Sequence, residues 1–215
     1  MKKIGFLFVT LVLAMMVSGC SNTGVGQQIE SKGDTVNNRS SLGQIVESYY
    51  KNYEPSNKGK THIFAQKVFM DGTLVLTEKN DGQGQSYTNL FFLDENKKII
   101  KKAQGQTPLS MCFTVNVIEY DGCKILFGNF NDSTWLIEPD KKKPVDIQNI
   151  LVRFKNGEVY SDDKVEKGYI ITSQSLADVE VIELYDNNGI LQSDLNDLRR
   201  YGSVFDETSF VDVVQ

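Results

Sequence analysis

Residues 113–127 read FTVNVIEYDGCKILF, and this stretch decides the fold class. Two runs of apolar and β-branched residues flank Asp121-Gly122, a dipeptide whose residues tolerate the positive φ angles of a two-residue hairpin turn. In the register that this turn sets, Glu119 faces Lys124 as a cross-strand pair of opposite charge. The stretch therefore predicts an antiparallel β-hairpin.

The same pattern recurs from His62 to the end of the chain, where short apolar runs alternate with turn residues. Further hairpins are predicted around Asp71-Gly72, residues 94–98, Asn156-Gly157 and residues 187–189. At Asn156-Gly157, a two-residue loop pairs Phe154 with Val159. Because strands recur about every 12 to 18 residues with almost no helix between them, we expect a mainly β fold, either an antiparallel sandwich or a barrel-like hairpin array.

Two helices are predicted at the edges of this β region. An N-terminal amphipathic helix is expected over residues 41–53, where apolar residues recur at the spacing of one helix face and Ser41 with Gln44 forms a capping box. Its tyrosines are more typical of a core-facing stripe than of a partner surface. Asp194 is placed to cap a short C-terminal helix over residues 194–201, which precedes a last strand at residues 210–214.

Residues 21–40 differ in composition from the body that follows. They are rich in Ser, Asn, Gln, Gly and Thr and hold almost no large apolar side chain. Such a segment buries too little surface to offset its ordering entropy. We expect residues 20–40 to form a flexible tether with a root-mean-square reach of about 25 Å, or in part to lie along the domain as irregular coil. Residues 41–215 are expected to form a single, mostly β domain.

Residues 1–19 have the features of an export signal. Lys2 and Lys3 precede an uncharged run over residues 4–17, and small residues follow it. This apolar run is shorter than the roughly 18 residues that a membrane span requires. The segment is therefore expected to direct export and then to be removed.

The tetrapeptide Val17-Ser18-Gly19-Cys20 matches all four positions of the bacterial lipobox, so the chain resembles a bacterial lipoprotein precursor. The resemblance covers about the first 22 residues. It implies that residues 1–19 are the signal peptide and that Cys20 becomes the first residue of the mature protein, with a thioether-linked diacylglyceryl group. Two acyl chains anchor a protein stably, which places it on the extracytoplasmic face of the cell membrane. The alternative is an ordinary cleaved signal with a chance cysteine.

The other two cysteines, Cys112 and Cys123, form an even pair, which suggests a disulfide in an exported protein. The predicted hairpin argues against it. Tyr120 faces Cys123, and Cys112 lies eight residues further along the strand, about 26 Å away at about 3.3 Å per residue. A disulfide requires Cα atoms within about 7 Å of each other. We therefore expect two unbridged thiols in the core.

The charge of the body is acidic. The formal net charge of −5 becomes −7 when Lys2 and Lys3 leave with the signal peptide. An acidic body opposes binding to nucleic acid and to anionic lipid, so the lipid on Cys20 would have to provide the anchor. Two basic runs interrupt this background, residues 97–102 and Lys141 to Lys143. The first is typical of a protected edge strand, and contact with anionic wall polymer or lipid headgroups is the functional alternative.

Few residues indicate catalytic chemistry. His62 is the only histidine, which excludes a zinc site built on several histidines, and HExxH, CxxC and Gly-x-Ser-x-Gly motifs do not occur. We assign no catalytic residue, no metal ligand and no cofactor. The candidate ligand-binding residues are Phe130 and Trp135, because they flank a polar run of the kind found in sugar and peptide sites. Burial of these aromatic residues in the core is the alternative.

The expected location and the lack of a catalytic motif favour a non-enzymatic binding or accessory module at the cell envelope, with an envelope polymer or a protein as partner. The alternative is an envelope hydrolase that uses carboxylates such as Asp132 or Glu138 in a cleft. A pocket that holds two carboxylates of shifted pKa would favour the hydrolase. A shallow aromatic or basic face would favour the binding module.

Overall fold

The computed structural model describes residues 32–55, 59–80, 86–136, 140–163, 165–200 and 205–213. Within them the protein is mainly β, as predicted, with mostly antiparallel sheets and two helices. The expected signal peptide, Cys20 and the first part of the expected tether lie outside the described residues. In the described part of the chain, no helix is both long enough and apolar enough to cross a membrane.

Three sheets and a separate two-stranded ribbon contain all the strands in the described ranges. The first sheet has the order β1 (Thr61–Phe69), β2 (Gly72–Asn80), β3 (Ser86–Leu93), β4 (Ile99–Gly105) and β15 (Val211–Asp212). The middle sheet has the order β11 (Gly168–Ser173), β6 (Cys123–Asn129), β5 (Asn116–Tyr120) and β14 (Asp206–Glu207). The third sheet has the order β10 (Val159–Asp162), β9 (Asn149–Phe154), β12 (Val179–Tyr185) and β13 (Leu191–Asp194). The ribbon pairs β7 (Ser133–Leu136) with β8 (Lys141–Pro144).

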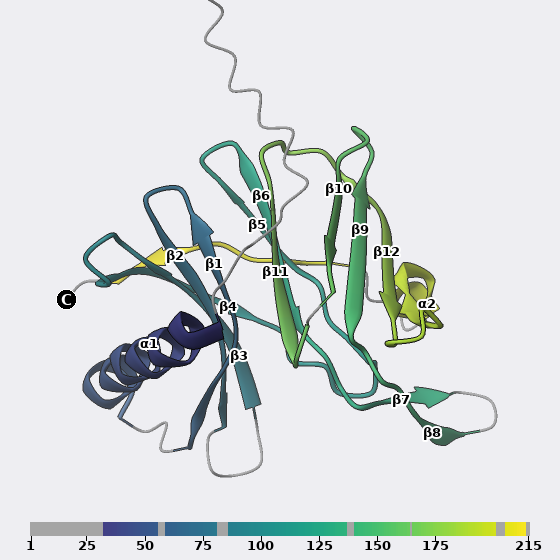
Figure 1. Ribbon diagram of the computed structural model, residues 1–215, viewed down its shortest axis with the longest axis horizontal. Helices are drawn as coiled ribbons and strands as arrows, with labels where there is room; N and C mark the ends of the chain where they lie inside the picture. The colour runs from purple at the N-terminus through teal and green to yellow at the C-terminus, as the bar shows by residue number, and fades with distance from the viewer. Residues whose placement is uncertain are drawn as a thin grey trace, which may run out of the picture.

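These elements stack in layers. Figure 1 shows α1 (Lys32–Tyr53) against the first sheet, then the middle sheet, then the third sheet with α2 (Leu195–Arg200) beside it. The strand β1 lies against β11, so the first and middle sheets come together along one edge. The fold is therefore a sandwich of three sheets, and its first two layers approach a flattened barrel.

The middle sheet is buried on both faces. On β6, Ile125 and Phe127 point into the core shared with the first sheet, while Leu126 points into the core shared with the third sheet. All three side chains are fully buried. A strand covered on both faces requires a continuous apolar run rather than an alternating one, which explains why residues 125–127 are Ile, Leu and Phe in succession.

The helix α1 covers the outer face of the first sheet. Leu42, Val46 and Tyr50 pack against apolar side chains of β2 and β3, including Val75 and Phe91. The core-facing interpretation of the tyrosines is therefore correct for Tyr50, which is buried, and not for Tyr53, which is exposed.

The expected start of this helix was wrong. The helix begins at Lys32 rather than Ser41, so residues 32–40, which were expected to belong to the tether, are helical, and Ser41 with Gln44 does not cap the helix. Once packing fixes one part of a helix, each further residue adds a hydrogen bond at little cost, so a helix can extend through a sequence that favours coil.

The Asp121-Gly122 hairpin is confirmed with its register. Glu119 pairs with Lys124 and Tyr120 pairs with Cys123, and the turn residues have φ angles of 49° and 74°. The Lys124 Nζ atom lies 3.5 Å from a carboxylate oxygen of Glu119. Both cysteines are free thiols. Cys112 is buried in the core between the middle and third sheets, whereas Cys123 is only partly buried, beside the core shared with the first sheet.

The hairpins at residues 94–98 and 187–189 are also confirmed, but two predicted turns are wrong by one residue. At the first, the turn is Met70-Asp71, and Gly72 is already paired with Phe69 in the sheet. A Cβ on Gly72 would lie 2.1 Å from the carbonyl oxygen of Leu93, so this glycine serves close strand approach rather than the turn.

The second shifted turn is at Asn156-Gly157. Arg153 pairs with Val159, and the Phe154 amide donates to the Glu158 carbonyl at 2.9 Å, so the loop has three residues and Phe154 does not face Val159. Gly157 supplies the positive φ of 90° that such a loop requires.

The C-terminal segment joins all three layers. Asp194 caps α2, as predicted, by accepting hydrogen bonds from the amides of Asn196 and Asp197 at 2.8 and 3.1 Å. Beyond α2 the chain adds β14 to the middle sheet and then β15 to the first sheet. Figure 1 shows this segment in yellow, crossing the stack from α2 to β15. The predicted last strand is thus present, but shorter than residues 210–214.

Candidate functional site

The two candidate ligand-binding residues occupy different environments. Phe130 is partly buried and stacks on Tyr169, with ring centroids 5.4 Å apart, at the edge of the core between the middle and third sheets. Trp135 lies on the ribbon, is 39% exposed, and donates from Nε1 to Asp140 at 2.8 Å. Phe130 thus contributes to packing, and Trp135 presents part of its ring at the surface.

The residues proposed for a hydrolase do not form a described acid–base pair. Asp132 accepts a hydrogen bond of 3.2 Å from the neighbouring Ser133 hydroxyl in an exposed position, and Glu138 lies outside the described residues. Among the described carboxyl groups, those with a shifted pKa are Glu47, Glu158 and Asp178, and all three pKa values are lowered. A general acid needs a raised pKa, so these groups act as ionised hydrogen-bond acceptors.

The pKa of Glu158 is lowered for a local structural reason. Burial works to raise it, but hydrogen bonds from Ser173, Asn156 and Tyr160 favour the charged form and outweigh burial. The Ser173 hydroxyl donates at 2.6 Å and the Asn156 amide at 2.7 Å. This carboxylate therefore holds the Asn156-Gly157 loop against the end of β11.

Two open grooves run along the sides of α1, where the helix lies across the first sheet. The first groove encloses about 490 Å³ between the helix and the turn after β3. Hydroxyl, amide and tyrosine side chains line its helix side, and two lysines line the other: Ser41, Gln44, Ser48, Tyr49, Asn52, Tyr53, Lys97 and Lys98. The second groove encloses about 430 Å³ on the opposite side of α1 and has Lys79 and Tyr50 among its lining residues.

The first groove combines an aromatic surface with polar groups. Tyr49 and Tyr53 stack with centroids 5.3 Å apart, and the Tyr53 side chain is 47% exposed. Burial, together with the charge of Glu54, raises the pKa of Tyr49 to about 12, so its hydroxyl stays protonated. Stacked rings beside amide, hydroxyl and ammonium groups suit an extended polar ligand such as a glycan or a peptide.

The lysine side of this groove is held in a fixed position. The Asp94 carboxylate accepts hydrogen bonds from the backbone amides of Asn96 and Lys98 at 2.9 and 2.8 Å. Lys97 adopts a φ of 62°, which completes the turn. The two ammonium groups therefore extend from a rigid backbone rather than from a loose loop.

Polar contacts to all four long strands of the first sheet fix α1 in place. Glu47 accepts a 3.0 Å hydrogen bond from the Thr61 amide of β1 and lies 3.4 Å from Lys79 Nζ of β2. The Asn89 amide of β3 donates to the Tyr50 hydroxyl at 2.8 Å. A further pair joins Lys102 of β4 to Glu54, the residue that directly follows α1. These contacts set the width of both grooves.

Lys79 is the most buried charge in this interface, with 2% of its side chain exposed. Its ammonium group lies 4.7 Å from the centroid of the Tyr50 ring, and the carboxylate of Glu47 is its ion-pair partner. Burial works to raise the pKa of Glu47, but hydrogen bonds from Thr61 and the charge of Lys79 outweigh it, so the pKa is lowered. Glu47 therefore stabilises the fold in its ionised form.

Sequence reasoning missed this interface. Lys79 lies in the polar run Thr77-Glu78-Lys79-Asn80, which follows an apolar strand segment and is typical of an exposed strand end. Its burial depends on α1, which lies about 30 residues earlier in the chain. The helical spacing of Tyr49 and Tyr53 was the one available signal for the groove.

Comparisons with known proteins identify no relative. No protein family matches the chain, and neither the curated proteins nor the solved structures contain a significant match.

We predict that Glu47→Gln lowers the free energy of unfolding by about 1 to 2 kcal/mol, because it leaves Lys79 buried without its ion-pair partner while the half-exposed Glu47 is partly screened by solvent. The contribution of Glu47 is fully present above its ordinary pKa of 4.5 and is lost as the pH falls through the lowered value. Urea denaturation at about pH 7 and about pH 3 measures both effects.

The matched control is Glu180→Gln, which changes an exposed carboxylate on β12. It should leave the urea midpoint unchanged at both pH values. Equal midpoints for the Glu47→Gln variant and the wild type near neutral pH would contradict the assigned role of this ion pair.

Proposed function

We propose that this protein is a membrane-anchored extracytoplasmic lipoprotein that works as a non-enzymatic binding or accessory module at the cell envelope. The observation that carries the proposal is the tetrapeptide Val17-Ser18-Gly19-Cys20, which directly follows a charged start and an uncharged run. Cys20 is the proposed site of lipid attachment. Through this lipid the protein would bind the membrane. Nucleic acid is not a proposed partner, because the chain is acidic.

The helix α1 links the proposed anchor to the body. Lys32, at the start of α1, lies twelve positions after Cys20. A chain of that length spans at most about 40 Å. A lipid on Cys20 would therefore keep the start of α1 within about 40 Å of the bilayer surface.

The first groove of α1 is the proposed binding surface for an envelope polymer or a protein. Its stacked tyrosines, hydroxyl and amide groups and two lysines supply stacking, hydrogen bonds and positive charge along one open path. It is open and shallow, which suits an extended partner better than a small substrate. An open face of this kind favours the binding module over the hydrolase.

We predict that Cys20→Ala abolishes palmitate labelling and releases the protein from membranes after a high-salt wash, because acyl chains rather than the acidic body provide the anchor. Metabolic labelling with palmitate followed by fractionation measures both. The control is Cys123→Ala, which should keep the label and the membrane location. A labelled Cys20→Ala protein would disprove lipid attachment at this residue.

We predict that Tyr53→Ala weakens retention of the protein on purified cell-wall glycan about three- to tenfold, because it removes the exposed ring of the groove. Co-sedimentation measures the bound fraction, and thermal denaturation should show an unchanged fold. The control is Val159→Ala, which removes an equally exposed apolar side chain from the third sheet. Equal retention of the Tyr53→Ala and Val159→Ala proteins would show that the first groove is not the polymer-binding site.

A further inference from the structure

We infer that the ribbon and the adjoining loop of residues 108–111 form a second contact with the membrane, directed at the surface of an anionic phospholipid bilayer. The inference uses the proposed lipid anchor only to bring the ribbon near a bilayer. The contact itself is argued from exposure, charge and rigidity of the described residues.

The ribbon places a lysine opposite an apolar or hydroxyl side chain at three successive positions. Its pairs are Trp135 with Lys142, Thr134 with Lys143 and Leu136 with Lys141. All three lysines are exposed. Figure 1 shows the ribbon projecting from the body, away from the three sheets. Each face of the ribbon thus carries both apolar surface and positive charge.

Several lysines of the body lie in ion pairs. Lys79, Lys102, Lys124 and Lys155 each lie within ion-pair distance of a carboxylate. In the described ranges, no carboxylate lies within ion-pair distance of Lys141, Lys142 or Lys143. The ribbon is therefore a local concentration of positive charge on an acidic protein, and it is complementary to an anionic surface.

The loop of residues 108–111 adds an apolar tip beside the ribbon. Leu109 is 90% exposed. The Asn131 side-chain amide donates to the carbonyl oxygens of Pro108 and Met111 at 3.2 and 2.8 Å, and the Trp135 amide donates to the Ser110 carbonyl at 2.9 Å. These bonds hold the loop on β7, so an apolar side chain is presented to solvent by a fixed backbone.

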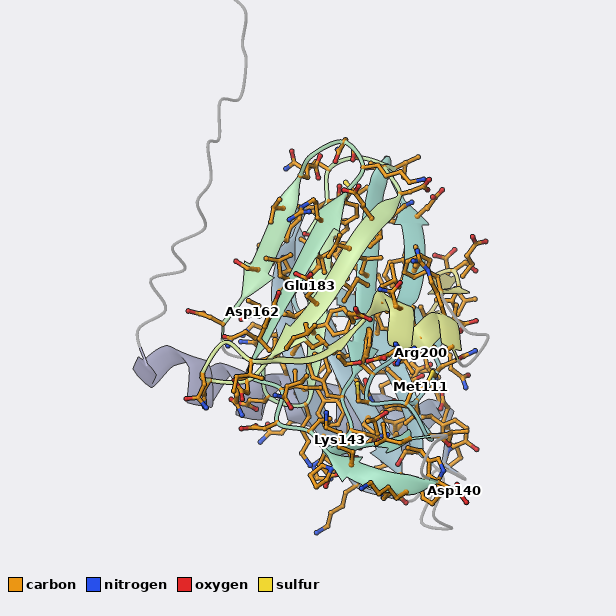
Figure 2. The ribbon with its side chains drawn as sticks, turned by 90° about the vertical axis from the view of Figure 1, so that its right-hand side faces the viewer. Met111, Asp140, Lys143, Asp162, Glu183 and Arg200 are labelled. Carbon is orange, nitrogen blue, oxygen red and sulfur yellow. The ribbon has the colours of Figure 1, made fainter. Side chains whose placement is uncertain are left out.

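The side of the molecule that carries the ribbon is of mixed charge, because Figure 2 labels Asp140, Asp162 and Glu183 there as well as Lys143 and Arg200. Figure 2 shows Lys143 of the ribbon, Met111 of the loop and Arg200 of α2 one above another on the side that faces the viewer. Arg200 is paired with Asp197 at 3.1 Å, so its charge is partly neutralised. The contact is therefore centred on Trp135 and the three lysines.

A bilayer fits these residues better than a soluble polymer does. Tryptophan is enriched at the membrane–water interface, and a fully exposed leucine gains from contact with acyl chains rather than with a charged polymer. Lysines near an anionic leaflet each contribute about 1 kcal/mol, which corresponds to about fivefold in an equilibrium constant. Three lysines together correspond to about 100-fold.

Trp135 is the only tryptophan in the chain, so its fluorescence reports on the ribbon alone. The full lipidated chain is placed in vesicles of phosphatidylcholine alone and in vesicles that also contain phosphatidylglycerol. We expect a blue shift of Trp135 emission and quenching by brominated lipid in the anionic vesicles only, with both effects reversed by high salt. Identical emission in the two kinds of vesicle would overturn the inference and leave the lysines as protection of the ribbon edges.

The variant that carries Lys141→Ala, Lys142→Ala and Lys143→Ala should reduce the ratio of quenched to unquenched Trp135 about 100-fold in anionic vesicles. The control carries Lys97→Ala and Lys98→Ala, which removes a basic pair from the α1 groove and should leave quenching unchanged. An equal loss in both variants would show that net charge, and not the ribbon, is responsible, and would overturn the inference.

Flotation of the same vesicles separates this inference from the proposed anchor. A chain that floats with both kinds of vesicle but shows no Trp135 response disproves only the ribbon contact. A chain that does not float disproves the lipid anchor. The Trp135 response of that chain to added anionic vesicles still tests whether the ribbon contacts the bilayer. An equal Trp135 response to soluble polyphosphate without vesicles would assign the ribbon to an anionic polymer and overturn the choice of a bilayer.

Discussion

Burial of the middle sheet on both faces is the constraint on which the rest of the structure depends. Ile125 and Phe127 contribute to the core shared with the first sheet, and Leu126 contributes to the core shared with the third, so β6 takes part in both cores between the sheets. Gly128 of the same strand lies so close to Thr114 that a Cβ would come within 2.0 Å of its carbonyl oxygen. The middle layer therefore has little freedom to change, and the elements outside it carry the candidate functions.

Features that depend only on residues close together in the chain could be predicted from the sequence. The register around Asp121-Gly122 was predictable because turn chemistry, cross-strand charge and apolar pattern agree there. At Gly72 the turn pattern is misleading. A side chain at this position would collide with the carbonyl oxygen of Leu93 on β3, and no local sequence pattern indicates that contact. At Asn156-Gly157 the glycine was identified correctly, but two- and three-residue loops both accept it. The stacking of three sheets was not predictable, because it depends on contacts between distant strands.

The candidate site was less predictable than the fold for the same reason. Phe130 and Trp135 lie five positions apart in the chain, yet one packs on Tyr169 and the other lies on the ribbon. The grooves of α1 depend on Lys79 and Lys97, which approach the helix only in the folded state. In contrast, the tetrapeptide Val17-Ser18-Gly19-Cys20 and the three consecutive lysines are local patterns that the sequence displays directly. The proposals on membrane attachment therefore rest on the sequence, and those on binding surfaces rest on the arrangement of α1 and the ribbon around the stack.

In this protein a doubly buried middle sheet supports the peripheral elements that carry the proposed contacts. Hydrogen exchange followed by mass spectrometry tests it most directly, because core amides exchange only through global unfolding whereas peripheral amides exchange through local opening. We expect the amides of β6 to exchange most slowly, and those of the ribbon to exchange orders of magnitude faster. Exchange of β6 as fast as that of the ribbon would contradict it.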